Sequence, residues 1–261
     1  MLNNILKNFF LQDLLPVLYN SNLKKKDQKF YFKKTFKSKS IVTKHDLYLE
    51  KKITNLIKVK FPDHQILSEE KVQKKTSSEY TWIIDPLDGT KSYILNFNSW
   101  SNLICLTHNG KPICSLVNFP ILNKNYFFFK DKIFTINNKK LKKLPIKKNN
   151  IKLRNSKIVS NSWYLLKNRG VKKFLEKNNF FFKIISLDAL SYFLLVENKI
   201  EVIIEKGIKN FDIVPILPFL KLSGALVTNF KGQKDLKDEF IISKNRKLHK
   251  FIIKKINEKK N

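Results

Sequence analysis

The alternation of strand-like and helix-like segments constrains the fold of this chain more than any other feature of the sequence. Short apolar runs, typical of buried strands, are separated by longer segments whose apolar residues recur at helical spacing. Because this order is found in both halves, it predicts a layered α/β architecture. Strands are expected at 65–67, 80–84, 103–108, 112–119, 125–129, 132–136, 157–160, 181–185, 201–205 and 225–229, and helices at 2–15, 46–59, 163–177, 188–198 and 212–222.

Local signals set several boundaries within this order. Pro16 is expected to end or kink the first helix, and Thr43 or Asp46 to cap the next long helix. Asn109-Gly110 is the strongest short hairpin signal, so the strands on either side of it should pair directly. The basic stretch 139–152 is interpreted as a linker or exposed edge, which divides the chain into an N-terminal half, 1–150, and a C-terminal half, 151–261.

The composition is that of a folded globular protein. Hydrophobic residues make up 43% and aromatic residues 13% of the 261 residues, which is enough to form a real core. No apolar run reaches the ~18 residues that a membrane span needs, and the N-terminal segment mixes polar and apolar residues too closely for a secretion signal. We therefore expect a cytoplasmic protein with no membrane association. Cys105 and Cys114 are too few for a disulfide framework and should be buried as small apolar side chains.

The net charge is +31, from 52 Lys and Arg against 21 Asp and Glu. A charge of this size is compatible with a basic nucleic-acid-binding protein. However, the basic residues are spread along the whole chain, and Lys, Asn and Ile all have AT-rich codons, so genomic base composition is an alternative explanation that involves no function. We favour this second explanation and expect no specific nucleic-acid partner. A positive field would still attract a phosphorylated substrate.

The acidic residues are scarce, and their distribution is more informative. Eight of the 21 lie between Asp46 and Asp88. A local excess of carboxylates in so basic a chain is typical of a site for hard divalent cations, which prefer oxygen ligands.

The segment Asp85-Pro86-Leu87-Asp88-Gly89-Thr90 follows an apolar strand directly. Two carboxylates project from one tight loop, and the Leu87 carbonyl between them is available as a further oxygen ligand. Gly89 and Thr90 should begin the next helix, whose free N–H groups can bind phosphate oxygens. Acidic ligands beside such an anion site suit metal-assisted phosphoryl transfer. An Asp-rich turn with a helix cap is the alternative, and the complete six-residue motif after a strand argues against it.

Four motifs, in this order and at these spacings, resemble the inositol-monophosphatase-like family. The resemblance runs from about residue 40 to about residue 235. It implies a five-layer α/β/α/β/α sandwich of the inositol-monophosphatase and fructose-1,6-bisphosphatase type. The motifs are Val42-Thr43-Lys44-His45-Asp46, Ser68-Glu69-Glu70, Trp82-Ile83-Ile84-Asp85-Pro86-Leu87-Asp88-Gly89-Thr90, and Phe211-Asp212 followed by Ser223-Gly224-Ala225.

The resemblance also implies residue roles. Glu69, Asp85 and the Leu87 carbonyl would bind a first Mg²⁺, and Asp85, Asp88 and Asp212 a second, with a third, weaker ion near Glu69. Asp46 and Thr90, with Glu69, would be the catalytic residues that orient and deprotonate the attacking water. Such metals lower the pKa of water and neutralise phosphoryl charge. Asp88, Gly89, Thr90 and Asp212 would contact the substrate phosphate group. Asp46 as a plain helix cap is the alternative for that residue.

Substrate choice is assigned to the second half. Glu205 occupies the position where the family contacts the non-phosphate part of the substrate, and Asp188 lies 24 residues before Asp212. Asp188, Lys91-Ser92-Tyr93-Ile94 and Phe211-Asp212-Ile213 resemble the histidinol-phosphate phosphatase branch. Two carboxylates would suit the ammonium and imidazole groups of histidinol phosphate. A helix N-cap is the alternative for Asp188.

The sequence thus predicts a Mg²⁺-dependent phosphomonoesterase acting on a small phosphorylated metabolite. The substrate favoured here is L-histidinol phosphate, which would place the enzyme in histidine biosynthesis. Inositol 1-phosphate and 3′-phosphoadenosine 5′-phosphate are the alternatives within the family. A basic nucleic-acid-binding protein is the alternative outside it. The resemblance leaves a homodimer open.

Overall fold

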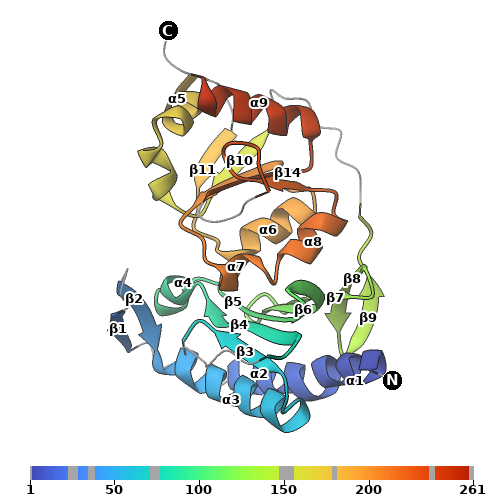
Figure 1. The fold of residues 1–261 in the computed structure, drawn as a ribbon. Helices are drawn as coiled ribbons and strands as arrows, with labels where there is room; N and C mark the ends of the chain where they lie inside the picture. The colour runs from blue at the N-terminus through green and yellow to red at the C-terminus, as the bar shows by residue number, and fades with distance from the viewer. Residues whose placement is uncertain are drawn as a thin grey trace. The chain divides into compact units, whose positions relative to one another are not determined.

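The computed structural model describes residues 2–22, 29–34, 39–70, 77–146, 156–177, 181–234 and 239–258. The chain forms two compact units (Figure 1). The first unit comprises Met1–Leu144 together with Val214–Pro218, and the second comprises Pro145–Ile213 together with Phe219–Asn261. Each unit contains its own sheet and its own apolar core.

The first unit is built on a seven-stranded sheet whose strands follow one another in chain order. Its first two strands are parallel, and all the later neighbours are antiparallel. The strands are β3 (Gln65–Ser68), β4 (Tyr80–Asp88), β5 (Ser101–His108), β6 (Lys111–Phe119), β7 (Lys124–Phe129), β8 (Lys132–Asn137) and β9 (Lys140–Lys143).

Two tight turns explain this order. The hairpin predicted at Asn109-Gly110 is confirmed, and both residues have the positive φ, 48° and 73°, that a two-residue hairpin turn requires. Asn138 and Lys139 form another such turn, with φ of 46° and 60°. The start of the basic stretch is therefore the edge strand β9, while residues 147–152 of that stretch lie outside the described part of the chain.

Helices of the N-terminal segment pack against this sheet. They are α1 (Leu2–Asn8), a π-helical turn η1 (Phe9–Leu14), α2 (Leu15–Asn22) and, after the hairpin of β1 (Phe30–Lys34) and β2 (Lys39–Thr43), the long helix α3 (Lys44–Lys60). Phe9 and Phe10 are fully buried and contact the Trp82 ring. Pro16 does not end the helical segment. It lies just after the π-helical turn η1, and α2 continues beyond it to Asn22.

The second unit has a five-stranded sheet in the order β11-β10-β12-β14-β13. The β10–β11 and β10–β12 pairs are parallel, and the pairs made by β14 are antiparallel. The strands are β10 (Lys157–Ser160), β11 (Phe181–Ile184), β12 (Val202–Lys206), β13 (Leu226–Thr228) and β14 (Glu239–Ser243).

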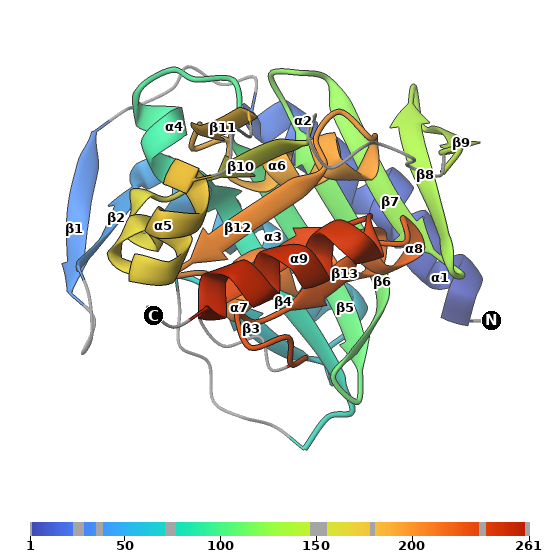
Figure 2. The same ribbon diagram turned by 90° about the horizontal axis from the view of Figure 1, so that it is seen from above.

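Helices cover both faces of this sheet. On one face, α5 (Arg169–Lys177) packs against α9 (Arg246–Asn257), as Figure 1 and Figure 2 show. On the other face lie α6 (Ala189–Val196) and α8 (Leu217–Leu222), whose Phe193 and Phe219 rings are in edge-to-face contact. The helix expected at 163–177 is divided into a 3₁₀ turn, Trp163–Lys167, and α5, because the Asn168 side chain accepts a hydrogen bond from Val171 N and caps α5.

Two further differences from the expected elements have simple causes. The helix expected at 212–222 is two helices, α7 (Asn210–Ile213) and α8, because Pro215 interrupts it, while Pro218 lies in the first turn of α8. Strand β14 and helix α9 were not among the expected elements. The signal for α9 is nevertheless present: Leu248, Ile252 and Ile256 recur every four residues and are buried.

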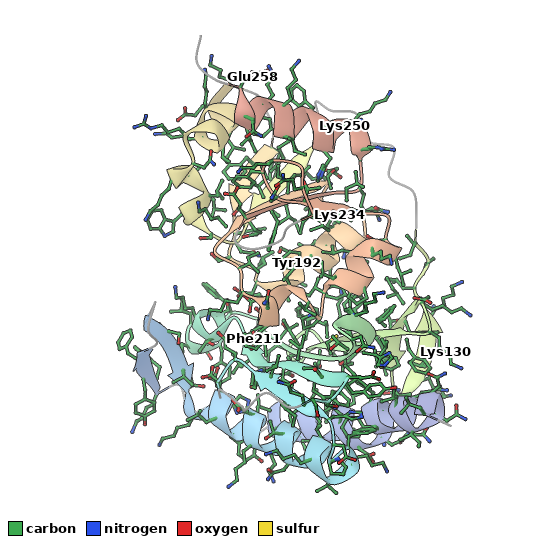
Figure 3. All side chains as sticks on the ribbon, viewed as in Figure 1. Lys130, Tyr192, Phe211, Lys234, Lys250 and Glu258 are labelled. Atoms are coloured by element: carbon green, nitrogen blue, oxygen red, sulfur yellow. The ribbon has the colours of Figure 1, made fainter. Side chains whose placement is uncertain are left out.

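Cys105 and Cys114 are both buried and unbridged, as predicted, and burial raises the pKa of both thiols. Within the described ranges, no helix combines the length and the hydropathy needed to cross a bilayer. The basic side chains extend from elements of both units. Lys130, Lys234 and Lys250, on three separate segments, are all exposed (Figure 3).

Candidate active site

The pairing of β3 with β4 brings Glu69 next to Asp85. Ser68 and Ile84 are partners in the parallel register, and Glu69 N donates a hydrogen bond to Ile84 O at 3.1 Å. Glu69 and Asp85 are therefore the residues that follow the paired Ser68 and Ile84. A carboxylate oxygen of Glu69 lies within 4.8 Å of a carboxylate oxygen of Asp85. Asp85 is only 2% exposed. Two carboxylates held this close repel each other unless a cation or a proton lies between them.

A β-bulge at Pro86 gives the loop between the two aspartates its shape. Strand β4 pairs with β5 through Asp85 and again at Asp88, with a register shift between them. Proline has no N–H to donate to the ladder, so a bulge is expected at this residue. The Asn102 side chain satisfies the carbonyl of this proline, since its Nδ2 donates to Pro86 O at 2.6 Å. Leu87 N donates to Asp85 Oδ1 at 3.0 Å, which fixes that carboxylate within the loop.

Asp88, Gly89 and Thr90 form the second part of the motif. Ser101 Oγ donates to Asp88 Oδ2 at 2.9 Å. Gly89 has φ of 81°, in the left-handed region, and precedes the short helix α4 (Thr90–Ile94). Thr90 Oγ1 lies 3.2 Å from Leu87 O and 3.2 Å from Asp46 Oδ1. The structure therefore brings Thr90 and Asp46 together, although 44 residues separate them in the sequence.

Asp46 has two structural roles. Thr43 is the N-cap of α3, and Asp46 completes a capping box by accepting hydrogen bonds from Thr43 N, at 2.8 Å, and from Thr43 Oγ1. The cap and the contact with Thr90 coexist, so neither interpretation of Asp46 excludes the other. Burial raises the pKa of Asp46 above its usual value, and the hydrogen bonds from Thr43 and Thr90 partly oppose this effect. Beside it, the His45 ring stacks on Tyr93 at 5.2 Å between centroids.

Asp212 belongs to the second unit, in α7, where its Oδ2 accepts a hydrogen bond from Lys209 N at 3.1 Å. Two residues later, at Val214, the chain enters the segment Val214–Pro218 that belongs to the first unit. That segment is attached to β6 by a hydrogen bond from Ser115 Oγ to Pro215 O, at 2.7 Å. Asp212 is therefore only three residues along the chain from Pro215, whose carbonyl is hydrogen-bonded to β6 of the first unit.

Asn161 organises the two residues that the sequence assigns to substrate choice. Its N–H donates to Glu205 Oε1 at 2.8 Å. Its side chain accepts from Leu187 N and donates to Asp188 O and to Ser191 Oγ, at 2.9, 3.1 and 2.9 Å. One residue thus connects the end of β10 with β12 and with the turn before α6. Asp188 precedes α6 but makes no side-chain cap, and its φ of 50° is unusual for a non-glycine residue.

Glu205 is 1% exposed and lies in an unfavourable environment for a charge. Burial is the main cause that raises its pKa to about 8; the Asp188 charge acts in the same direction, and the hydrogen bond from Asn161 N opposes them. At neutral pH the Glu205 carboxyl is therefore mostly protonated. A neutral carboxyl can donate one hydrogen bond and accept others.

Sequence reasoning missed Asn102, Ser101 and Asn161. The first two carried a signal, because they are polar residues at the start of an otherwise apolar strand. Asn161 carried none, since its role depends on contacts with residues 26 to 44 positions away.

The donor set of the first unit fits a hard divalent cation. The carboxylates of Glu69, Asp85 and Asp88 and the carbonyl of Leu87 are all oxygen ligands. No nitrogen or sulfur ligand stands among the predicted metal ligands, so the set favours Mg²⁺ over Zn²⁺.

Comparison with known proteins identifies the family. The model of the inositol monophosphatase family matches residues 17–261. A bifunctional phosphatase, IMPL2, of Arabidopsis thaliana is 28% identical over 79% of this chain, which spans 61% of the length of that relative. A fructose-1,6-bisphosphatase/inositol-1-monophosphatase of Aquifex aeolicus is 29% identical, covering 82% of this chain and 81% of the relative. A histidinol-phosphatase of Chlorobaculum parvum is 24% identical over 81% of this chain and 82% of its own, so that branch is not singled out.

Solved structures agree with this assignment at the level of the fold. An IMPase of Thermotoga maritima superimposes with a TM-score of 0.73 at 23% identity, covering 97% of this chain and 95% of its own. An IMPase/NADP phosphatase complexed with Mg²⁺ and phosphate gives 0.76 at 21% identity, with coverages of 97% and 94%. The predicted α/β fold of the inositol-monophosphatase type is confirmed. This chain belongs to the inositol monophosphatase family of metal-dependent phosphomonoesterases.

Proposed function

We propose that this protein is a Mg²⁺-dependent phosphomonoesterase whose substrate is a small polyol phosphate of the inositol 1-phosphate type. The observation that carries the phosphatase activity is the group of oxygen donors on the β4 loop, next to the hydrogen-bonded pair of Thr90 and Asp46. Glu69, Asp85, the Leu87 carbonyl and Asp88 would hold Mg²⁺. We assign Asp212 to the same ligand set, because it lies only two residues before Val214, where the chain rejoins the first unit.

Mg²⁺ supplies Lewis acidity, which neutralises charge on phosphoryl oxygens and acidifies water. The protein supplies the proton acceptor. Thr90 Oγ1 can donate its one hydrogen bond to Asp46 Oδ1 or to Leu87 O, and its oxygen lone pairs can accept a hydrogen bond from the attacking water. Burial raises the pKa of Asp46, which makes its carboxylate a better base than an exposed aspartate. Gly89 and Thr90, at the start of α4, offer main-chain N–H groups to the phosphate.

The environment of Glu205 supports a hydroxylated substrate. A buried carboxyl that is mostly protonated at neutral pH suits a hydroxyl group, to which it can donate and from which it can accept. A cationic substrate would first have to displace this proton. The names of the relatives, in which inositol monophosphatase recurs, point the same way.

Histidinol phosphate remains the second candidate, and a specific observation favours it. Asp188 lies close enough to Glu205 for its charge to raise the pKa of Glu205. Two neighbouring carboxyl groups could share one ammonium group, which would ionise both of them. Asp188→Ala tests this role: it should impair hydrolysis of histidinol phosphate far more than hydrolysis of a generic aryl phosphate. Equal losses on both esters would rule out Asp188 as a specificity residue.

The deciding experiment measures phosphate release by purified protein with Mg²⁺. The substrates are inositol 1-phosphate, histidinol phosphate and 3′-phosphoadenosine 5′-phosphate, and Asp88→Asn is the control for a contaminating phosphatase. We expect preferential turnover of inositol 1-phosphate, lost in Asp88→Asn. Turnover of none of the three esters by folded, Mg²⁺-loaded protein would contradict the proposal.

Glu205→Gln separates the two leading substrates. Glutamine keeps the shape and the hydrogen-bonding capacity of a neutral glutamic acid but cannot ionise. If Glu205 recognises a hydroxyl group, kcat/KM for the preferred ester should fall by less than about tenfold. If Glu205 pairs with a cation, the loss on histidinol phosphate should be about a hundredfold or more.

A further inference from the structure

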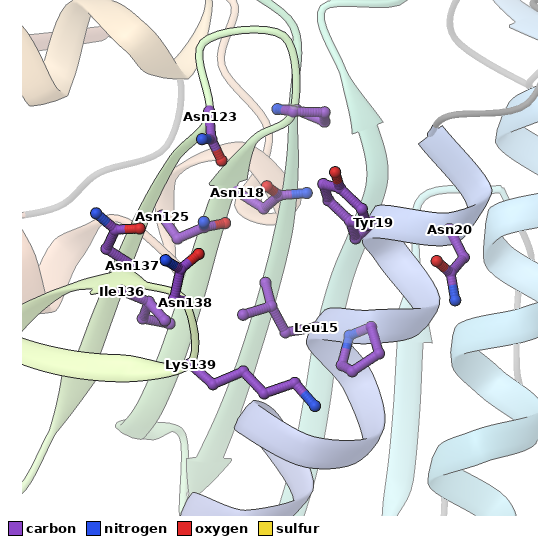
Figure 4. Close-up of a pocket in the computed structure, with 12 residues that line it drawn as sticks. Leu15, Tyr19, Asn20, Asn118, Asn123, Asn125, Ile136, Asn137, Asn138 and Lys139 are labelled. Carbon is purple, nitrogen blue, oxygen red and sulfur yellow. The ribbon is translucent and has the colours of Figure 1, made fainter.

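A cavity of about 390 Å³ lies in the first unit, apart from the metal ligands. Helix α2 forms one wall, and the ends of β6, β7 and β8 with their turns form the other (Figure 4). Six of its twelve lining residues are asparagines, and Lys139 is the only lining residue with a charged side chain. Cavities of this size accommodate small-molecule ligands. Nothing in the proposed reaction uses this cavity.

A row of three asparagines leads from this cavity to the metal loop. Asn102 on β5 is the register partner of Asn118 on β6, and Asn118 is the partner of Asn125 on β7. Directly opposite residues of antiparallel strands project from the same face of the sheet, so the three amides form one line. Asn118 and Asn125 line the cavity, and Figure 4 shows both side chains there.

Hydrogen bonds connect the row to Pro86. Asn118 Nδ2 donates to Asn102 Oδ1 at 2.6 Å, and Asn102 Nδ2 donates to Pro86 O at 2.6 Å. Pro86 lies in the bulge between Asp85 and Leu87, both of which we assign to Mg²⁺. A change in the orientation of the Asn118 amide therefore acts on the loop that carries three proposed metal ligands.

The row buries polar amide groups. Asn102 is fully buried and Asn118 is 5% exposed, and buried amides cost free energy unless they are hydrogen-bonded. The third amide is incompletely bonded, because among the described residues Asn125 Oδ1 is buried and has no hydrogen-bond partner. Such groups are rare in native structures and call for an explanation. A ligand that reorients the Asn125 amide would provide the missing partner.

The lining indicates the chemistry of the ligand. Amide groups donate and accept hydrogen bonds, which suits several hydroxyl groups. Leu15 and Ile136 offer apolar surface for the carbon skeleton. Lys139 Nζ donates a hydrogen bond to Gln12 Oε1 at 3.4 Å, and none of the twelve described lining residues is acidic. These lining residues suit a hydroxylated molecule that carries one anionic group.

We propose that this cavity binds a small polyhydroxylated molecule carrying one anionic group, and that the asparagine row couples its binding to the Mg²⁺ affinity of the β4 loop. The second part rests on the proposed function, because it takes Asp85 and Leu87 as metal ligands. Coupling of this kind is reciprocal: if the ligand tightens Mg²⁺ binding, Mg²⁺ tightens ligand binding by the same factor.

The first test is direct binding. Glucose 6-sulfate is the probe, because it carries hydroxyl groups and one anionic group but is not a phosphate ester. Isothermal titration calorimetry of the full chain should detect its binding, and glucose without the sulfate should bind more weakly. Lys139→Met should weaken binding of glucose 6-sulfate by about fivefold or more, whereas Lys140→Met, on the exposed edge strand next to it, should not.

The second test is coupling. Saturating glucose 6-sulfate should lower the Kd for Mg²⁺, measured by calorimetry, by about fivefold. Asn118→Ala should abolish this shift while Mg²⁺ still binds. Because Asn118 is buried and its replacement could prevent folding, Lys139→Met provides a second measurement: at the same probe concentration it should reduce the shift, and Lys140→Met should preserve it.

Three results would overturn the proposal. Absence of binding at millimolar probe would reject the ligand class. Equal binding to the wild-type protein and Lys139→Met would place the probe elsewhere and reject the cavity as its site. Binding without any change in the Kd for Mg²⁺ would reject the coupling. None of these results depends on phosphate release, so failure of the proposed phosphatase activity would be recognised separately.

Discussion

At the scale of single residues, Glu205 makes the stability of the protein depend on pH. Its pKa is raised from 4.5 to about 8 in the folded state. Between these values the folded state holds a proton that the unfolded state has released, so the free energy of unfolding decreases as pH rises from about 5 to about 8. Above pH 8 the Glu205 carboxyl is ionised, and the full free-energy cost of burying its charge lowers the stability of the folded state.

Glu205→Gln should remove this dependence. We expect the variant to be more stable than the wild-type protein by a few kcal/mol near pH 8.5 and to differ little near pH 4.5. Urea unfolding at both pH values measures the difference. Glu201→Gln is a matched control, because Glu201 is equally buried on the same unit, but it has a charged partner in Lys157, 3.7 Å away. A wild-type protein whose stability rises from pH 5 to pH 8 relative to Glu205→Gln would contradict the prediction.

His249 produces the opposite dependence. Burial lowers its pKa to about 4, and its Nε2 lies 2.9 Å from Thr228 Oγ1. Below the usual histidine pKa of 6.5, His249 is protonated in the unfolded state but remains neutral in the folded state. The free energy of unfolding therefore decreases as pH falls from about 6.5 to 4. His249→Gln should flatten this acid limb of the unfolding curve, measured by thermal unfolding between pH 4 and 7.

At the scale of secondary-structure elements, Gly170 decides how closely α5 and α9 approach. A Cβ atom at this residue would lie 1.9 Å from Ile256 O, which belongs to the backbone of α9 and cannot move aside cheaply. Gly170→Ala should therefore cost about 2–3 kcal/mol of stability. Gly110→Ala, in the Asn-Gly turn, meets nothing within 4 Å and should cost only about 1 kcal/mol, from its φ of 73°. Equal losses in thermal unfolding would show that the α5–α9 contact is adaptable.

Asn161 acts between elements. Asn161→Ala removes the side-chain hydrogen bonds that fix the turn before α6, but it keeps the main-chain bond to Glu205. We expect a loss of about 2 kcal/mol in stability and a rise in KM for the preferred ester, with the Kd for Mg²⁺ unchanged. Ser186→Ala, which removes a single hydrogen bond of the same cluster, should have a clearly smaller effect on KM.

The sequence predicted elements well where local chemistry defines them. Asn109-Gly110 gave the β5–β6 hairpin, and the apolar strand before Asp85 gave β4. Prediction failed where contacts between residues far apart in the sequence determine the structure, and where charged residues obscure the spacing of the apolar ones. The lysines of α9 obscure the spacing of Leu248, Ile252 and Ile256. The Asp46–Thr90 contact was anticipated only through the family resemblance. The Asn161 and Asn118 contacts could not be anticipated, because each depends on which strands become neighbours.

At the scale of the whole molecule, the net charge of +31 should affect substrate capture. Exposed lysines lie on elements of both units, so many segments of the chain contribute to the positive field. Such a field accelerates association with anionic esters and is screened by salt. We expect kcat/KM to fall severalfold between about 20 and 200 mM NaCl at constant free Mg²⁺, with kcat little changed. Sucrose at matched osmolality is the control and should lower kcat/KM by no more than the increase in viscosity accounts for.

The segment Val214–Pro218 has a consequence for how the protein is made. It belongs to the first unit, yet residues 145–213 of the second unit precede it in the chain. Synthesis proceeds from the N-terminus, and domains generally fold in that order as they emerge. The first unit cannot acquire its last segment until residue 218 has been added, when β10, β11 and β12 of the second unit already exist. The nascent chain can therefore complete the first unit only after residues 145–213 of the second unit have been synthesised. A ribosome that stalls before residue 214 leaves both units incomplete.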